Sequence, residues 1–537
     1  MESISHHIFL FPFTIDIKEN TTNFLDDVEK SLLKAKWLSH PFIPSKKRTN
    51  YSEYFYFHPF ARNAIFDKGE KTPEDQEQPI IKYYYQKTGK NACFRLFIKG
   101  KEEPYELTIK RISLRVYETQ IGIMSFELEN TRYKDIEDIL LINDFGKRIY
   151  PQFLDKKDGV ESPKYVFLAN KVEFKIDDNT SYIEDFCETS FLKDHIVVAN
   201  YIQQLLGQDF STNKKEKTPY VYSPTIDDRM YVICWFGSNE FSRQLVPIIS
   251  HNNHSYQYSD LWYRYIFHDG KSLNCKNFKM KQNLIKKATY ERWAEYGTFY
   301  GISRYGWVCV TENFENNFIK LHMRKQYAQM AVLLLAQRAS ILRFSQRVSA
   351  ISSEIKEMKS DKMKKISQKV SDLHAAYICF VNRMWFTEVS PQEQGIEMYE
   401  QAVQNMRLKE DMYDLKNEIK ELHEYTSNAL ERETNSQMYI LTILGALFLP
   451  LMLLTGFFGM NLSFINDNHI LSLLPSFLKE DYGNICVSVI SLVLFLTFIL
   501  IIYNRIRAYI NFLKEQDENI LKHLKLKYFV FTPKKKT

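Results

Sequence analysis

Residues 438–460 read MYILTILGALFLPLMLLTGFFGM, and this stretch decides how the rest of the chain is interpreted. A helix of 23 residues is about 34 Å long, enough to cross the ~30 Å hydrocarbon core of a bilayer. A second uncharged stretch, 482–504, contains ICVSVISLVLFLTFILIIY and is also long enough to cross. Buried helices of soluble proteins usually keep a polar edge, so the two stretches predict a transmembrane hairpin.

The charges beside these stretches predict the orientation of the hairpin. The connecting loop, 462–483, carries one Lys against three acidic residues, whereas 504–537 holds nine Lys or Arg and three acidic residues. Positive residues stay on the cytoplasmic side, so we expect a multi-pass protein of the plasma (inner) membrane with both termini in the cytoplasm. The basic tail accounts for the net charge of +6. The remainder is near neutral, and we expect no direct nucleic acid binding.

The amino-acid composition indicates which class of protein the part outside the membrane belongs to. With 45% apolar and 25% charged residues, most of the chain is typical of a water-soluble globular protein. The seven cysteines are scattered and never form C-x-x-C, so neither a disulfide framework nor a zinc finger is indicated. We therefore expect the soluble part to face the reducing cytosol.

A long helix is predicted to lead into the first membrane stretch. Ser390, Pro391 and Glu393 form a helix start, with a Ser cap, Pro at the first helical position and Glu closing a capping box. The next proline is Pro450, so a helix continuous to Met460 would hold 70 residues, about 105 Å. A coiled-coil seam facing partner helices is predicted by Leu408, Met412, Leu415, Ile419 and Leu422.

A further series within the membrane stretch also alternates three and four residues apart. It places small, polar and flexible side chains on one stripe. Two interpretations are open: a close helix contact made by small residues, or a pore lining built by symmetric copies of the helix. The series comprises Asn435, Met438, Thr442, Gly445, Leu449, Met452 and Gly456.

The motif Gly459-Met460-Asn461 follows this stripe, and the whole segment resembles the CorA divalent-cation channel family. The resemblance runs from Asn435 to Asn461 and extends to the long preceding helix and the basic residues after the second membrane stretch. It covers about the last quarter of the chain and the preceding helix. Further matching positions are Met438, Leu441, Thr442, Phe448, Pro450 and Gly456.

The resemblance implies a symmetric homo-pentamer in the lipid bilayer that conducts Mg²⁺ or another divalent cation. Asn461 and the carbonyl of Gly459, with Met460 between them, would form the outer selectivity site for a hydrated cation. Mg²⁺ gives up its water reluctantly, so neutral oxygen dipoles suit such a site. Met438, Thr442 and Leu449 would form constrictions along the pore.

The chain departs from the family pattern in its long outer loop, its tail and its enlarged N-terminal part. An enlarged N-terminal domain on a CorA-type hairpin is similar to the membrane effectors encoded beside type III CRISPR systems, an impression to which QRASILRFS at 337–345 adds. That likeness implies that the channel is opened by a small nucleotide messenger of the S-adenosylmethionine–AMP class. The residues that would bind this messenger are unknown. The alternative is a housekeeping Mg²⁺ importer gated by intracellular Mg²⁺.

The sequence of the N-terminal part predicts an α/β fold with a mixed sheet. We expect strands rich in aromatic and β-branched residues, and helices between them. No G-x-x-x-x-G-K or G-x-G-x-x-G motif occurs, and no nucleophile, base and orienting group can be named, so we do not expect an enzyme. The strands are expected at 7–15, 82–86, 92–98, 105–118, 165–176 and 230–236, and the helices at 134–146, 193–206 and 278–297.

Three local segments have two interpretations each. AVLLLA at 331–336 is too short to span a membrane and predicts a buried helix. His251 and His254 could bind a metal, but their polar neighbours favour an exposed loop. The cations and aromatics of 46–62 suit either a nucleotide-binding surface or, more often, one face of a strand. The cationic and aromatic residues of that segment are Lys46, Lys47, Arg48, Tyr51, Tyr54, Tyr56, His58 and Arg62.

These observations predict a six-part organisation. A cytosolic α/β sensor domain is expected at 1–320, a helical stalk at 321–437, a pore-lining transmembrane helix at 438–460, an outer loop with the GMN motif at 461–484, a second transmembrane helix at 485–503, and a basic cytosolic tail at 504–537.

Overall fold

The structure is a computed structural model that describes most of the chain as far as Gly459. It divides into two compact units, 1–426 and 427–537. The helices expected as a stalk as far as residue 426 therefore belong to the same unit as the sheet. The described residues are 3–18, 23–69, 79–149, 169–186, 197–226, 229–246, 255–312, 318–356, 363–459, 497, 500, 503–505 and 507.

One mixed sheet of fourteen described strands is the centre of the first unit. Its long strand β1, Ser5–Ile17, pairs antiparallel with β6, β10 and β11, while β11 and β14 run parallel. The prediction of an α/β domain with a mixed sheet is confirmed. The other strands are β2 Leu38–Ser39, β3 Ile81–Gln86, β4 Cys93–Phe97, β5 Tyr105–Tyr117, β6 Ile121–Asn130, β7 Lys171–Lys175, β8 Ser181–Asp185, β9 Phe210–Ser211, β10 Tyr220–Pro224, β11 Tyr231–Gly237, β12 Thr289–Tyr290, β13 Phe299–Ile302 and β14 Gly306–Thr311.

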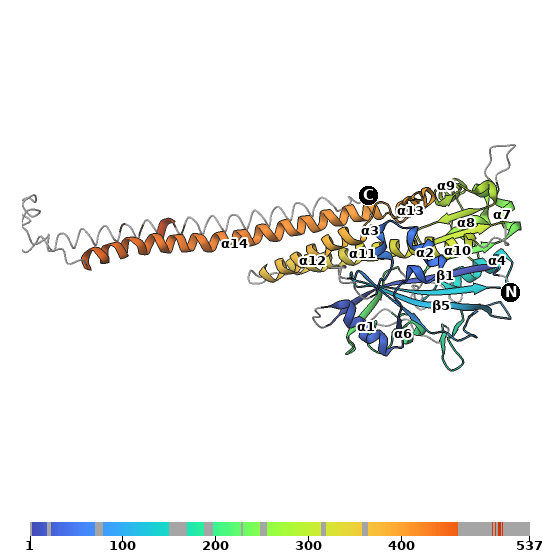
Figure 1. Cartoon of the computed structure of the whole chain (residues 1–537). Coiled ribbons are helices and arrows are strands. Elements are labelled where there is room, and N and C mark those ends of the chain that lie inside the picture. Colours follow the sequence, from blue (N-terminus) through green and yellow to red (C-terminus); the bar gives the residue numbers. More distant parts are fainter. Residues whose placement is uncertain are drawn as a thin grey trace, which may run out of the picture. The chain divides into compact units, whose positions relative to one another are not determined.

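Helices cover both faces of this sheet, because successive side chains of a strand point to opposite sides. Phe9, Phe11 and Phe13 of β1 join one core, and Ile8 and Leu10 join the other. Helices α1, α4, α6, α7, α8 and α9 contribute to the first core, and α3, α11, α12, α13 and the start of α14 contribute to the second. Figure 1 shows α1 and α6 on one side of β1 and β5, with α11 and α12 on the other.

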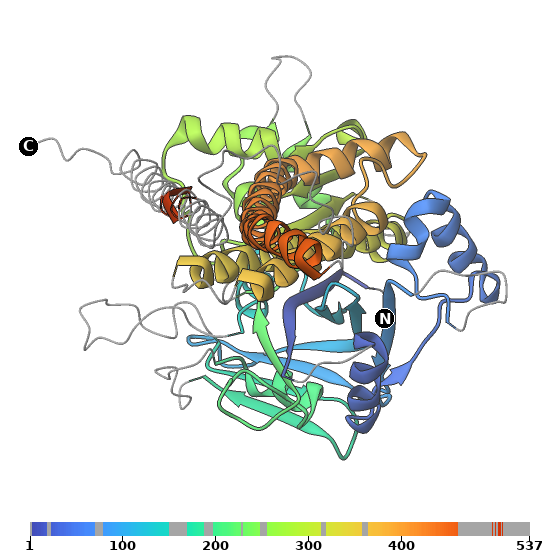
Figure 2. The same cartoon turned by 90° about the vertical axis from the view of Figure 1, so that its left-hand side faces the viewer.

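The helices vary greatly in length. Their bounds are α1 Phe24–Lys34, α2 Arg48–Phe55, α3 Pro59–Ile65, α4 Ile136–Gly146, α6 Asn200–Leu206, α7 Asn239–Leu245, α8 Asp260–Phe267, α9 Phe278–Ala288, α10 Phe318–His322, α11 Ala328–Lys356, α12 Met363–Met384, α13 Glu393–Met406 and α14 Leu408–Gly459. A π-helix, Met323–Tyr327, joins α10 to α11. Figure 2 shows the yellow helices α11 and α12 beside the blue and cyan strands of the sheet.

The expected strands agree with β1, β3, β4, β5 and β11 to within a few residues. Of the strand expected at 165–176, 171–175 form β7, and residues 165–168 lie outside the described part of the chain. Residues 331–336 form a buried part of α11, as predicted.

Two of the expected helices are shorter than predicted. Helix α6 occupies only 200–206 of the expected 193–206, and 193–196 lie outside the described residues. The helix expected at 278–297 ends at Ala288, where the chain forms β12. Thr289 and Tyr290 pair there with Gly301 and Tyr300, so sheet pairing overrides the helical pattern.

The expected continuous helix from residue 390 to 460 is wrong in two respects. Helix α13 begins at Glu393 without a side-chain cap, so Ser390 is not its N-cap. The Ser390 hydroxyl instead donates to the carbonyl of Tyr56, 2.6 Å away, and Pro391 precedes the helix. The second difference is a break at Arg407 between α13 and α14.

Arg407 adopts the left-handed conformation, with φ of 59°. A residue with a Cβ atom pays about 1–2 kcal/mol for this conformation. The reason for the break lies on either side, since Met406 and Leu408 are both fully buried. The turn at Arg407 therefore lets consecutive helices bury both of these side chains in the second core.

The predicted coiled-coil seam is buried within a single copy of the chain. Leu408, Met412, Leu415, Ile419 and Leu422 all belong to the second core, together with residues of α11 and α12. The heptad spacing thus marks the face of α14 that packs on its own unit, and the expectation of partner helices on this seam is corrected.

Among the described residues, no helix is both long enough and apolar enough to cross a membrane. The predicted segment 438–460 coincides with α14 as far as Gly459. The outer loop 461–484, nearly all of 485–503 and most of the tail lie outside the described residues.

We expect Leu415→Ala to lower the free energy of unfolding by about 3 kcal/mol, because it leaves a cavity in a fully packed core. Urea unfolding of the detergent-solubilised full chain, followed by tryptophan fluorescence, measures this change. The exposed neighbour Asp414 provides the control, and Asp414→Ala should change stability by less than about 0.5 kcal/mol. Unchanged stability of Leu415→Ala with weaker association between copies would show that the seam lies between chains.

Candidate functional sites

Helix α14 carries all seven positions of the predicted pore stripe, from Asn435 to Gly456. It ends at Gly459, the first residue of the GMN motif, while Met460 and Asn461 lie outside the described residues. At 100° per residue, the alternating spacing of three and four keeps the stripe on one face of α14.

Apolar side chains are exposed around this part of α14. On the stripe, Met438, Leu449 and Met452 are 59%, 62% and 71% exposed. Ile440 and Leu444 lie roughly opposite the stripe and are also exposed. Such extensive exposed apolar surface marks a site of contact with lipid or with other protein surfaces.

Thr442 and Gly445 are two of the polar or small positions of the stripe. The Thr442 hydroxyl donates to the carbonyl of Met438 at 2.8 Å, so its proton is held by the helix. The oxygen of Thr442 therefore keeps lone pairs that can accept from another group. At Gly445, an added Cβ atom would meet no atom within 4 Å, so this position leaves open space on the stripe.

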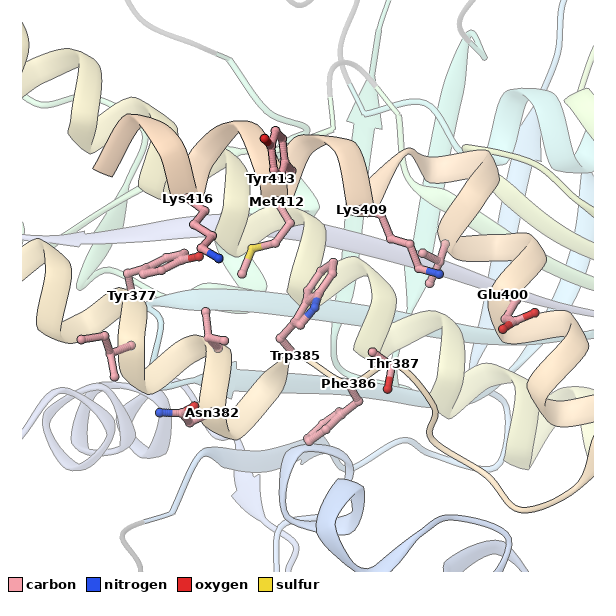
Figure 3. Close-up of a pocket in the computed structure, with 13 residues that line it drawn as sticks. Tyr377, Asn382, Trp385, Phe386, Thr387, Glu400, Lys409, Met412, Tyr413 and Lys416 are labelled. Carbon is pink, nitrogen blue, oxygen red and sulfur yellow. The ribbon is translucent and has the colours of Figure 1, made fainter. Parts of the chain in front are cut away.

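A pocket of about 470 Å³ lies within the first unit, between the end of α12 and the first turns of α14. Figure 3 shows the Trp385 ring extending from the end of α12 toward α14, and Lys409 and Lys416 extending from α14 toward α12. Helix α13 contributes Glu400. The lining residues are Tyr377, Ile378, Val381, Asn382, Trp385, Phe386, Thr387, Glu400, Val403, Lys409, Met412, Tyr413 and Lys416.

Positively charged side chains outnumber negatively charged ones in the lining of this pocket. Two lysines and one carboxylate line it, and none of the three makes an ion pair with another described residue. Burial raises the pKa of the Tyr377 phenol above its ordinary value, so its hydroxyl stays protonated at neutral pH and can donate. The pocket therefore offers cationic and neutral donors beside aromatic rings.

Polar contacts hold α13 against the edge of the sheet. Arg292 donates to Glu397 and Glu393, each at 2.7 Å, and the Tyr290 hydroxyl donates to Glu397. The hydrogen bond from Tyr290, followed by that from Arg292, lowers the pKa of Glu397. Glu397 is therefore ionised at neutral pH and fixes α13 beside β12.

The segment 46–62 is not a strand. It forms a short 3₁₀ helix, Pro44–Lys46, followed by α2 and α3. The Arg62 guanidinium lies 4.5 Å from the centre of the Tyr54 ring, so these two residues contact each other. His58 bonds Glu388 at 2.8 Å. The second local pair, at 251 and 254, lies outside the described residues.

A buried carboxylate anchors this helical segment. Glu53 of α2 is 1% exposed. Lys325 donates to one of its oxygens at 2.8 Å and Gln329 donates to the other at 2.7 Å. Lys325 belongs to the π-helix, where Arg324 also pairs with Glu127 of β6. These ion pairs connect the start of α11 to α2 and to the sheet.

The segment 337–345 lies in the middle of α11 and has structural contacts. Gln337 donates to the carbonyl of Met384 at 2.8 Å. Arg343 donates to Asp16 at 2.7 Å. These bonds connect α11 to α12 and to the end of β1.

Sequence reasoning did not find the pocket. Its residues come from three helices and a connection, so no single motif contains them. The available signals were Trp385-Phe386 just before the predicted helix start and two lysines seven residues apart, at 409 and 416.

Comparison with known families identifies the C-terminal part. Residues 386–505 match a family model described as "CorA-like Mg2+ transporter protein". The match begins in the connection before α13 and includes α14 and the GMN motif. The chain therefore carries a CorA-like domain, which is the domain of divalent-cation transporters and channels and implies a membrane protein. No curated protein matches the chain.

We expect Glu53→Ala to lower the free energy of unfolding by about 3 kcal/mol, because it leaves the Lys325 ammonium without its buried partner. Chemical unfolding of the full chain measures the change. Tyr51→Ala, at an exposed position of the same helix, is the control and should have a much smaller effect. Equal effects of the two substitutions would contradict an anchoring role of Glu53.

Proposed function

We propose that the chain forms a CorA-like membrane cation channel, assembled as a symmetric homo-pentamer and opened by a nucleotide second messenger in type III CRISPR defence. Its two membrane helices would be residues 438–460 and 485–503, with both termini in the cytoplasm. Flow of cations through the open pore would collapse ion gradients and stop growth.

One observation carries the channel proposal: the CorA-like match includes the whole pore stripe and the GMN motif. The exposed apolar side chains of α14 from Met438 to Met452 support it. In a pentamer, the face with Thr442 and Gly445 would line the axis, and the opposite face with Ile440 and Leu444 would contact lipid or neighbouring helices.

The proposed pathway suits a hydrated cation. The Thr442 oxygen has lone pairs for the water shell of the ion, and Asn461 with the Gly459 carbonyl would supply a second ring of neutral dipoles. Neutral oxygens hold hydrated Mg²⁺ without stripping its tightly held water. Met438 and Leu449 would form apolar constrictions that close the pore by dewetting.

The large N-terminal unit supports the gating proposal. All the described strands of the large sheet precede the CorA-like match, and helices cover both faces of this sheet. A folded domain of this size attached to a channel is suited to sensing a ligand. The messenger we propose is a nucleotide of the S-adenosylmethionine–AMP class.

The alternative is a housekeeping importer of Mg²⁺ or another divalent cation that is closed by intracellular Mg²⁺. The description of the matched family favours it, because that description names Mg²⁺ transport. The two proposals share the pore and differ in what opens or closes it.

We expect Asn461→Ala to reduce cation flux to the background of empty liposomes while membrane insertion is retained, because the outer ring of amide dipoles is lost. Flux of Mg²⁺ into proteoliposomes measures this effect. Asn466→Ala, in the same predicted loop, is the matched control and should retain flux. Normal flux through Asn461→Ala would exclude Asn461 from selectivity.

We expect the S-adenosylmethionine–AMP conjugate to raise cation flux by roughly 5- to 150-fold at constant Mg²⁺, the range of typical coupling free energies. Proteoliposomes with the messenger applied at the cytoplasmic face test this directly. Flux that falls with Mg²⁺ alone and ignores the nucleotide would support the importer instead.

A further inference from the structure

We propose that the pocket between α12 and α14 binds a small ligand with a planar aromatic ring and a phosphate, that is, a nucleotide, and that this ligand acts directly on α14. The gating part of this inference rests on the proposed function, whereas the binding part rests on the pocket itself.

The pocket has the size and walls of a site for a small aromatic molecule. Its volume of about 470 Å³ lies within the usual range for small-molecule sites, ~300–1,000 Å³. Trp385 and Tyr377 place two aromatic rings between α12 and α14, and Phe386 and Tyr413 also line the pocket, with the Tyr413 ring directed away from α12 in Figure 3. The Trp385 indole N–H has no hydrogen-bond acceptor among the described residues. A heteroaromatic base can stack on such rings and accept a hydrogen bond from the indole.

The cations of the pocket suit a phosphate. Lys409 and Lys416 are seven residues apart, which places them on one face of α14 about 10 Å apart along its axis. Figure 3 shows both side chains on the side of α14 that faces α12. Both ammonium groups lack a carboxylate partner within the described part of the chain, so they are free to pair with an anion.

The single acid of the pocket suggests where a second charge would lie. Glu400 lies on α13, toward the opposite end of the lining from Lys416 in Figure 3. A nucleotide that also carries a cationic group could place its phosphate at the lysines and its cation near Glu400. This arrangement favours a zwitterionic nucleotide over a simple one such as AMP.

Binding at this site would act on the helix that carries the pore stripe. Lys409, Met412, Tyr413 and Lys416 are residues of α14, whereas Tyr377 and Trp385 lie on or just after α12. A ligand that contacts both sides binds best at one arrangement of the two helices. It therefore shifts the population toward that arrangement by its differential affinity.

The test measures binding and flux for the full-length pentamer in nanodiscs and proteoliposomes. The probes are AMP and the S-adenosylmethionine–AMP conjugate. We expect Trp385→Ala to weaken binding of both probes by roughly tenfold or more. The double substitution Lys409→Gln with Lys416→Gln should have a similar effect. Glu400→Gln should weaken binding of the conjugate several-fold and leave AMP binding unchanged.

Two matched controls lie outside the pocket. Trp293→Ala removes an exposed tryptophan, and Lys420→Gln removes a lysine of α14 that pairs with Glu424. Both controls should bind the probes like the unsubstituted chain. A normal unfolding midpoint for each variant shows that lost binding does not come from lost folding.

The outcomes separate this inference from the proposed function. Nucleotide-dependent flux that survives all pocket substitutions would place the messenger elsewhere, so the pocket inference would fail alone. An absence of binding by either probe to the unsubstituted chain would overturn both the pocket inference and nucleotide gating. Loss of the pentamer in the Trp385→Ala and lysine variants would show that a second copy of the chain fills the pocket.

Discussion

The turn at Arg407 is the constraint on which the C-terminal half of the first unit depends. It buries Met406 and Leu408 on successive helices, and the core contact of both side chains offsets the unfavourable left-handed backbone. Because of this turn, the heptad face of α14 packs onto α11 and α12. Lys409, Met412 and Lys416 follow this turn and line the pocket at the end of α12, together with Glu400 and Val403 that precede it.

A second set of interactions holds the N-terminal end of α11. Glu53 and Glu127 are buried carboxylates that receive hydrogen bonds or ion pairs from Lys325 and Arg324 of the π-helix. Removing one partner of such a pair leaves an uncompensated buried charge, so the position of α11 is strongly determined. Helix α11 thus joins the sheet to α12 as a fixed element, and α14 packs on this fixed surface.

The sequence predicted the parts of the fold that depend on local patterns. Alternating aromatic and β-branched residues located β1, β5 and β11, and the GMN motif located the CorA-like domain. The break at Arg407 could not be predicted, because nothing in the local sequence marks an Arg that adopts the left-handed conformation when burial on both sides favours it. The same heptad spacing fits packing within one chain or between chains, and only the core contacts distinguish these cases. Residues 46–62 look like a strand locally, but they form helices, and the bonds of Glu53 to the distant residues Lys325 and Gln329 have no signal in the local sequence.

The family match begins at Phe386, and this boundary passes through the lining of the pocket. Tyr377, Asn382 and Trp385 precede the matched region, whereas Glu400, Lys409 and Lys416 lie within it. The CorA-like region and the residues just before it therefore both contribute to one cavity. Substitutions at the end of α12 can therefore change the shape and polarity of this cavity during evolution without altering any residue of the CorA-like region.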